Sequence, residues 1–346
     1  MSTSGSAAAK NTGHTESHSQ KQQEKPWWTW TKRALTVLLF VLVFGLLFNL
    51  VKNLEWQEVK DAITGYKTTT LLLGAAIALI SYGLFSSFDL LARHYTQHKL
   101  PARQILPLAF VCYAFNLNLS AWVGSLAVRY RLYSRLGLEV GTITKIFTIN
   151  VVTNWLGYII LAGIIFAARL LNLPDEWNLG ATALQLIGFG LLLVAAIYLL
   201  ACRFSKRRTW KIRDHEITLP TWQFAILQAT MGAVNWMLMA LLVYILLPEE
   251  AFYPTVLGIL LICSIAGIIT HIPAGLGVLE TIFLTMLQHE FNKSEILAAL
   301  LGYRALYFLL PLCIACVAYL VMEKRAKAMR GSNEKHSSNE RDAESY

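Results

Sequence analysis

The segment His271-Ile-Pro-Ala-Gly-Leu-Gly-Val-Leu-Glu280 decides the fold, because it lies between two apolar runs at residues 255–269 and 281–287. Proline, glycine and charged side chains interrupt a helix here, where the flanking runs are apolar enough to lie inside a membrane. Non-helical backbone is tolerated at that depth only where protein or a water-filled cavity covers it. The segment therefore predicts the tip of a re-entrant helical hairpin over residues 255–287.

A degenerate counterpart lies upstream, at Ser120-Ala-Trp-Val-Gly-Ser-Leu-Ala-Val-Arg129. Under one constant offset, Gly124 aligns with Gly275 and Arg129 aligns with Glu280. This correspondence predicts a second re-entrant hairpin, over residues 105–128.

The composition is that of a membrane protein: of 346 residues, 55% are hydrophobic and only 15% are charged. Long apolar runs at residues 34–51, 181–202 and 296–321 are each able to span a bilayer as a helix. The net charge of +9 is clustered beside such runs, which favours contact with anionic headgroups. Nucleic acid is excluded as a partner because no soluble domain remains to bind it.

Charge placement decides how residues 105–128 lie in the membrane. If they crossed it, the arginine-rich loop 129–135 and the basic loop 203–213 would both be external, against the positive-inside rule. If they enter and leave on the cytoplasmic side, these loops fall on the expected side. Each arm of about 11 residues then reaches about 16 Å, roughly half of the ~30 Å hydrocarbon core.

The predicted fold class is an all-α polytopic membrane protein, with six spans and two re-entrant helical hairpins arranged as an inverted repeat. A transmembrane domain at residues 26–330 is expected between disordered cytoplasmic tails at residues 1–25 and 331–346. Repeat one covers about residues 34–168 and repeat two about residues 181–321. The predicted spans are residues 34–51, 71–91, 146–168, 181–202, 224–247 and 296–321.

A substrate site is expected at mid-depth, where the second half-helix of each hairpin begins, near residues 120–123 and 273–275. The positive dipole ends of these half-helices suit an anionic group. The alternative is that the tip glycines only allow close helix packing. The candidate substrate-binding residues are Asn118, Ser120, Gly124, Arg129, Asn154, His271, Pro273, Gly275, Gly277, Glu280 and Arg304.

Several candidates have two interpretations. Arg129 either contacts a cytoplasmic headgroup or only enforces orientation. Arg304, inside the last span, either pairs with Glu280 or faces an anionic substrate. His271 is either a proton-dependent switch or a hydrogen-bonded structural histidine.

Other polar side chains in apolar runs are also ambiguous. Asp89 is expected to pair with Arg93 at the membrane surface, the alternative being a buried functional carboxylate. Four amides are expected either to bind headgroups or to join helices by hydrogen bonds. These amides are Asn150, Asn154, Gln228 and Asn235.

No catalytic or metal-binding pattern is present in the sequence. It contains no phosphate-binding loop of the Walker type, no zinc-protease motif and no hydrolase nucleophile motif. Cys313 and Cys316 lie within an apolar run, where cysteine behaves as a small hydrophobic residue. We therefore predict no cofactor, no metal and no enzymatic activity.

Four motifs carry a resemblance to a known family: residues 116–124, 129–137, 153–158 and 265–280. They closely resemble YbhN-type bacterial inner-membrane proteins, which are similar to the transmembrane flippase domain of lysyl-phosphatidylglycerol synthases. The resemblance covers roughly residues 30–330. It implies an integral inner-membrane protein that moves a phospholipid between leaflets. The aminoacyl-transferase domain of the synthases has no counterpart here, so the resemblance implies no synthase activity.

The predicted function is that of a lipid transporter, or flippase, which moves an anionic phospholipid between the leaflets of the bacterial cytoplasmic (inner) membrane. Both termini are expected in the cytoplasm. The alternative is a non-catalytic scaffold or partner subunit for lipid metabolism or envelope maintenance. A lipid-modifying enzyme is a third hypothesis, which lacks a nucleophile or an acid–base pair. The sequence identifies no protein partner.

Overall fold

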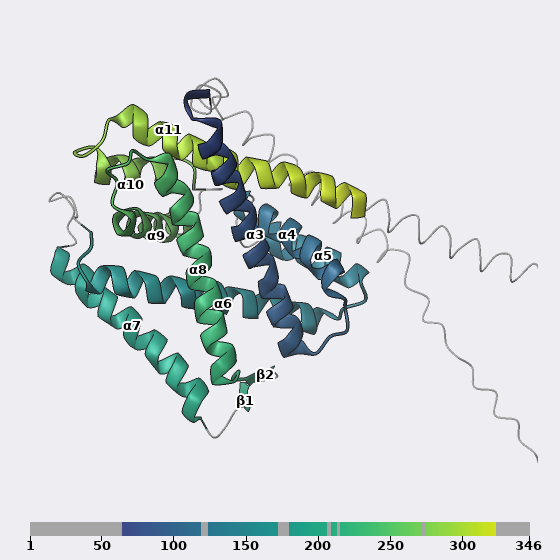
Figure 1. The fold of residues 1–346 in the computed structure, drawn as a ribbon. Helices are drawn as coiled ribbons and strands as arrows, with labels where there is room; N and C mark the ends of the chain where they lie inside the picture. The colour runs from purple at the N-terminus through teal and green to yellow at the C-terminus, as the bar shows by residue number, and fades with distance from the viewer. Residues whose placement is uncertain are drawn as a thin grey trace, which may run out of the picture. The chain divides into compact units, whose positions relative to one another are not determined.

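The computed structural model describes residues 64–118, 124–171, 180–205, 209–212, 215–270 and 275–322. All of them belong to one compact unit, Val43–Tyr346. The predicted helical class is confirmed, and Figure 1 shows the arrangement. The elements in chain order are α3 (Thr68–Thr96), α4 (Ala102–Asn118), α5 (Gly124–Arg135), α6 (Val140–Ala167), α7 (Ala181–Phe204), β1 (Thr209–Ile212), β2 (His215–Thr218), α8 (Trp222–Leu246), α9 (Tyr253–Thr270), α10 (Val278–Leu287), α11 (Lys293–Tyr303) and the π-helix η2 (Arg304–Leu309).

Six helices in the described part of the chain are long and apolar enough to cross a membrane. Five coincide with predicted spans, and the predicted first span at residues 34–51 lies outside the described residues. The sixth is α9, which we predicted as a hairpin arm. Its 18 residues correspond to about 27 Å, nearly the thickness of the hydrocarbon core. The six helices are Thr68–Thr96, Val140–Ala167, Ala181–Phe204, Trp222–Leu246, Tyr253–Thr270 and Lys293–Met322.

The first predicted hairpin corresponds to the helices α4 and α5, which pack against each other. Our estimate for its first arm was too short, because α4 has 17 residues. The helix continues through Asn116 and Asn118, where we expected an interruption. The Asn118 amide nitrogen donates to the carbonyl oxygens of Ala114, 2.9 Å away, and Phe308, 3.4 Å away, whereas its amide oxygen is buried without a hydrogen-bond partner.

Helices α6 and α8 cross at two glycines, at the centre of the described fold. A Cβ atom added to Gly157 would lie 2.1 Å from the carbonyl carbon of Gly232. One added to Gly232 would lie 2.1 Å from the carbonyl oxygen of Thr153. Only glycine permits backbones to approach this closely, as small residues do at helix interfaces in membranes.

Polar side chains join the same two helices. The Gln228 amide donates to the Thr153 hydroxyl at 3.0 Å, and the Trp236 indole donates to the Asn154 carbonyl at 3.2 Å. The Asn235 amide oxygen accepts from Ser81 of α3 at 2.9 Å. The interpretation that Gln228 and Asn235 join helices is therefore confirmed.

Helix α7 lies at the periphery. Only 11% of its most apolar window is buried, against 61% for α6. Its outward side carries Leu186, Phe189, Leu193 and Ile197, all more than half exposed. Because hydrocarbon chains are as apolar as leucine, such a surface suits direct contact with lipid.

Helix ends gather at two opposite ends of the fold. The first end, which we call the basic end, is where α3 and α7 end and α8 begins. There the Tyr95 ring of α3 lies 5.9 Å from the Phe224 ring of α8. There the Arg203 guanidinium of α7 also lies 6.0 Å from the Trp222 ring. The structure adds one feature that we did not predict at this end, a short antiparallel pair of strands, β1 and β2, which connects α7 to α8.

At the opposite end of the fold, other helix termini contact one another. The Tyr66 hydroxyl, just before α3, donates to the carbonyl oxygen of Leu246 at the end of α8, at 2.8 Å. The Thr255 hydroxyl of α9 donates to the carbonyl oxygen of Leu170, just after α6, at 3.4 Å. Helix α4 therefore begins next to the basic end of the fold, whereas α9 begins at the opposite end.

Substituting the crossing glycine tests the packing of α6 on α8. We expect Gly157→Ala to reduce stability by about 1–3 kcal/mol, because the added methyl group forces two backbones apart. Gly83→Ala in α3 is the matched control, since a Cβ atom there meets nothing within 4 Å. Thermal unfolding in detergent measures both variants. Equal melting temperatures for the two variants would contradict the close crossing.

Candidate functional site

A buried carboxylate organises the first cluster of charged residues. The Asp89 side chain of α3 has no exposed surface, and the Arg129 side chain of α5 is 4% exposed. The Arg129 Nη1 atom donates to Asp89 Oδ1 at 2.6 Å, and the Tyr133 hydroxyl donates to Oδ2 at 2.6 Å. Asn150 of α6 also donates its amide to Oδ1. One carboxylate thus ties three helices together.

This cluster corrects two interpretations. Asp89 does not form the expected surface pair with Arg93, and its burial agrees with the alternative. Arg129 lies in a buried ion pair, which neither of its two interpretations included. Two buried charges at membrane depth are tolerated only when they are paired and hydrogen-bonded.

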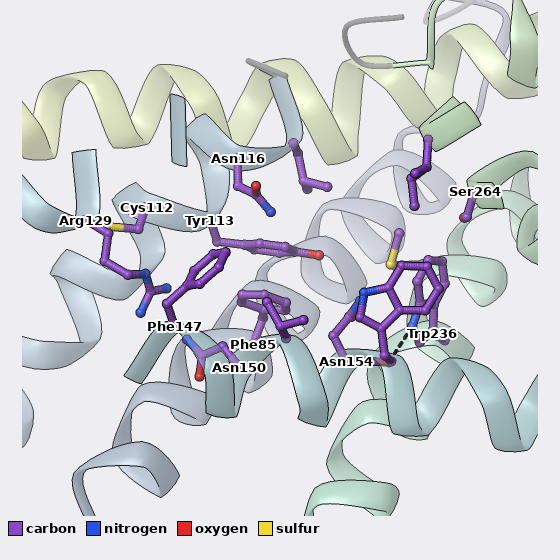
Figure 2. Close-up of a pocket in the computed structure, with 15 residues that line it drawn as sticks. Phe85, Cys112, Tyr113, Asn116, Arg129, Phe147, Asn150, Asn154, Trp236 and Ser264 are labelled. Carbon is purple, nitrogen blue, oxygen red and sulfur yellow. Dashed lines mark hydrogen bonds between the residues drawn. The ribbon is translucent and has the colours of Figure 1, made fainter. Parts of the chain in front are cut away.

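A cavity of about 250 Å³ adjoins this cluster. Its described lining comes from α3, α4, α5, α6, α8 and α9. Two helix pairs correspond to the predicted hairpins, α4 with α5 and α9 with α10, and both contribute to the cavity, the second through α9. In Figure 2, Arg129 and Cys112 lie at one end and Trp236 and Ser264 at the other, with Tyr113 between them. The lining residues are Phe85, Cys112, Tyr113, Asn116, Leu117, Arg129, Phe147, Asn150, Val151, Asn154, Trp155, Trp236, Met239, Ser264 and Ile268.

The two ends of the cavity differ in chemistry. At the charged end, the Nε atom of Arg129 and the Oδ1 atom of Asn150 are buried without a hydrogen-bond partner. The carboxylate of Asp89 attracts the amide group of Asn150, so the amide oxygen is left free to accept a hydrogen bond. Toward the other end the walls are aromatic, and the Phe85 and Tyr113 rings stack with centroids 3.6 Å apart. The cavity therefore suits a polar group that has apolar neighbours.

A second ion pair holds the second helix pair. Arg304 donates from Nε to Glu280 Oε1 at 2.5 Å and from Nη2 to Oε2 at 2.9 Å, which is a bidentate contact. The Nη2 atom also donates to the Gly275 carbonyl at 3.1 Å. The predicted Glu280–Arg304 pair is confirmed. The arginine is the first residue of the π-helix η2, and single π-turns are frequent at functional sites.

Helix α10 begins later than we predicted. Gly277 is its N-cap, and both Gly275 (φ +57°) and Gly277 (φ +80°) adopt positive φ angles that favour glycine. Glu280 lies in the first turn of α10. Its carboxylate accepts the Gly277 N–H at 2.9 Å. The positive end of the α10 helix dipole is therefore already partly compensated by a carboxylate of the protein.

A tyrosine network connects the cavity wall to the π-helix. The hydroxyl of Tyr113, which lines the cavity, is hydrogen-bonded to that of Tyr307 at 2.9 Å. Tyr307 lies in η2, three residues after Arg304, and is also hydrogen-bonded to Ser81 at 2.8 Å. The Tyr82 hydroxyl donates to the Tyr307 carbonyl at 3.0 Å. These buried bonds link the first cluster's cavity to the helix that holds the second ion pair.

The predicted site residues therefore fall into four sets. Arg129 and Asn154 line the cavity, and Asn118 lies next to it, bonded to η2. Gly275, Gly277, Glu280 and Arg304 form the second cluster, which contributes no residue to the described cavity lining. Gly124 begins α5. The remaining predictions lie outside the described residues: Ser120, His271 and Pro273.

Sequence reasoning missed Asp89, Tyr113 and Tyr133 as site residues. Asp89 was noticed but assigned to a local partner, and a tyrosine inside an apolar run gives no signal of its own. In the described part of the chain, no group of three or more histidine, cysteine or carboxylate residues is placed to hold a metal ion.

Comparisons with known proteins agree with this architecture. Residues 34–315 match the family model described as the lysylphosphatidylglycerol synthase TM region. The chain is 47% identical to the inner membrane protein YbhN of Escherichia coli, over 89% of this chain and 98% of that protein. It is 30% identical to an uncharacterized Synechocystis protein, over 87% of this chain and 95% of that protein.

A more distant relative is larger. The phosphatidylglycerol lysyltransferase of Bacillus subtilis is 23% identical over 80% of this chain, and the match covers only 32% of that protein.

Removing one partner of the first ion pair tests its role. We expect Asp89→Leu to reduce stability by about 3–5 kcal/mol, because it leaves the Arg129 guanidinium buried and unpaired. The double substitution Asp89→Leu/Arg129→Met removes both charges and restores most of the loss. Glu249→Gln, at an exposed carboxylate, is the control and changes stability by less than about 0.5 kcal/mol. A double variant that is less stable than Asp89→Leu alone would contradict the pairing.

Proposed function

Because the chain belongs to the family of the lysylphosphatidylglycerol synthase TM region, we propose that it moves an anionic phospholipid between the leaflets of the inner membrane. The headgroup occupies the cavity beside Arg129 during this passage. The observation that carries the proposal is the cavity itself, which both helix pairs line and which holds a buried arginine with an unpartnered Nε–H group.

The chemistry of the lining supports a phospholipid as the ligand. An Nε–H group of a guanidinium donates well to a phosphate oxygen, and Asn116, Asn150 and Asn154 add polar groups around it. Aromatic walls accept the first methylene groups of a glycerolipid. The cavity is smaller than the roughly 300–1,000 Å³ of pockets for drug-sized ligands, so it holds a headgroup while the acyl chains remain in the bilayer.

The direction of the helix pairs supports an inverted repeat with two re-entrant hairpins. Helix α4 begins at the basic end, and α5 returns there, because the Tyr130 hydroxyl is hydrogen-bonded to Thr144 at the start of α6. Helix α9 begins at the opposite end, beside Leu170. Two interrupted helix pairs that enter from opposite faces are the arrangement of many secondary transporters. By the positive-inside rule, the basic end then faces the cytoplasm.

Reconstitution provides the decisive test of transport. In proteoliposomes of phosphatidylglycerol and phosphatidylethanolamine, the wild-type protein is expected to exchange labelled phosphatidylglycerol between leaflets. The variant Ser264→Trp fills the cavity with an indole ring, and exchange falls to the protein-free background. Ile197→Trp on the lipid-facing side of α7 is the matched control and retains exchange.

The outcomes separate transport from a scaffold role. Exchange that is unchanged in Ser264→Trp would remove the cavity from the proposal. An absence of exchange with the wild-type protein alone would favour a scaffold or partner subunit.

Cysteine accessibility tests the topology. In a cysteine-free background, Gln97→Cys and Ser134→Cys are expected to resist a membrane-impermeant thiol reagent in intact cells, because both positions lie at the basic end. Gly180→Cys, before α7 and at the opposite end, is expected to react. If Ser134→Cys reacted as Gly180→Cys does, α4 and α5 together would cross the membrane, and the re-entrant arrangement would be wrong.

A further inference from the structure

A hollow with basic walls lies at the basic end, away from the cavity. Its volume is about 560 Å³, and its lining comes from the last turn of α3 and the loop that follows. None of the described lining residues is acidic. The residues are Leu90, Arg93, His94, Gln97, His98 and Lys99.

The His98 ring is one of the groups that line this hollow. Its Nδ1 atom accepts the backbone N–H of Leu100 at 3.4 Å, so the proton of the neutral ring lies on Nε2. The Nε2 atom is buried without a hydrogen-bond partner. Burial lowers the pKa of His98 from its ordinary value, and nearby Arg93 lowers that pKa further. The positive charge of the hollow therefore comes chiefly from Arg93 and Lys99.

A second hollow of about 480 Å³ continues from the first. It forms a groove between α3 and α8, and Leu90 and His94 line both spaces. Ser87 and Leu91 of α3 and Phe224, Leu227 and Met231 of α8 line the rest of its length. The two helices are antiparallel, so residues 94 to 87 and 224 to 231 both lead inward from the basic end. Seven residues of helix correspond to about 10 Å of depth.

The order of these surfaces matches the order of groups in a phospholipid. Cationic side chains lie at the end of the fold, and apolar side chains lie deeper, toward the bilayer. The N-terminus of α8 also lies at the mouth of the groove, where Thr221 and Gln223 line it, and a helix N-terminus favours an anion. A soluble anion would fit the basic hollow but would leave the apolar groove unused.

We propose that this seam between α3 and α8 binds one anionic phospholipid, with its phosphate between Arg93 and Lys99 and an acyl chain in the groove. This lipid site is distinct from the transport cavity, because the two share no described lining residue. At this lipid site, a membrane lipid is a fixed ligand that joins α3 to α8. The proposal does not depend on transport activity.

Native mass spectrometry measures the bound lipid directly. The Ser264→Trp background fills the transport cavity, so that the remaining specific lipid is the one at the seam. This protein is titrated with dioctanoyl phosphatidic acid, with dioctanoyl phosphatidylcholine and with inorganic phosphate. We expect one saturable adduct with phosphatidic acid. Removing two cationic side chains by Arg93→Gln/Lys99→Gln weakens it by roughly tenfold or more.

Two further variants make the test specific. Lys145→Gln/Lys293→Gln removes two exposed charges elsewhere and leaves the adduct unchanged. Leu90→Trp blocks the junction between the hollow and the groove and weakens lipid binding. Equal phosphatidic acid binding by wild type and Arg93→Gln/Lys99→Gln would overturn the proposal. Unchanged binding in Leu90→Trp, with full competition by inorganic phosphate, would also overturn it and identify a soluble-anion site instead.

Discussion

The buried ion pair between Asp89 and Arg129 is the constraint on which the described fold depends. Neither charge can be left alone inside a membrane protein, because an isolated buried ion has lost its hydration without compensation. The carboxylate therefore fixes the position of α5 against α3, and Asn150 adds α6 to the same cluster. The cavity exists because these three helices are held by a polar cluster at one end rather than by continuous apolar packing.

The second ion pair also fixes a short helix, with the charges reversed. Position 129 carries the cation of the first pair, and its aligned counterpart, position 280, carries the anion of the second. In each case the charged residue lies on the second helix of an interrupted pair, and its partner lies on a long neighbouring helix. An ion pair fixes a short helix that lacks the length to be anchored by packing alone. The partners differ in place, because Asp89 precedes its helix pair in the chain whereas Arg304 follows its pair, so the two ion pairs share a role without being equivalent positions of a repeat.

The sequence predicted most of the helical architecture and one of the two ion pairs. Span-length apolar runs and the distribution of basic loops are properties of the whole chain, so five of the spans could be located without a structure. Glu280 and Arg304 are separated by 24 residues and had no competing partners nearby. Asp89 and Arg129 are 40 residues apart, and Arg93 at helical spacing offered a nearer partner. Sequence spacing alone could not reveal that Asp89 and Arg93 do not pair.

The tyrosine network adds a physical connection between the cavity and the second ion pair. Tyr113 forms part of the cavity wall, and its hydroxyl contacts Tyr307 within the π-helix that begins at Arg304. A π-turn contains one residue more than the α-helical ladder accommodates, so its conversion to a regular helix would rotate the residues that follow. Such a rotation would move Tyr307 away from Tyr113 and change the path of the chain after Arg304. In the proposed binding mode, a headgroup that displaced the Tyr113 ring would act on the same element that holds Glu280. The transport proposed above would require this kind of dependence between the two helix pairs, because opening one face must be linked to closing the other.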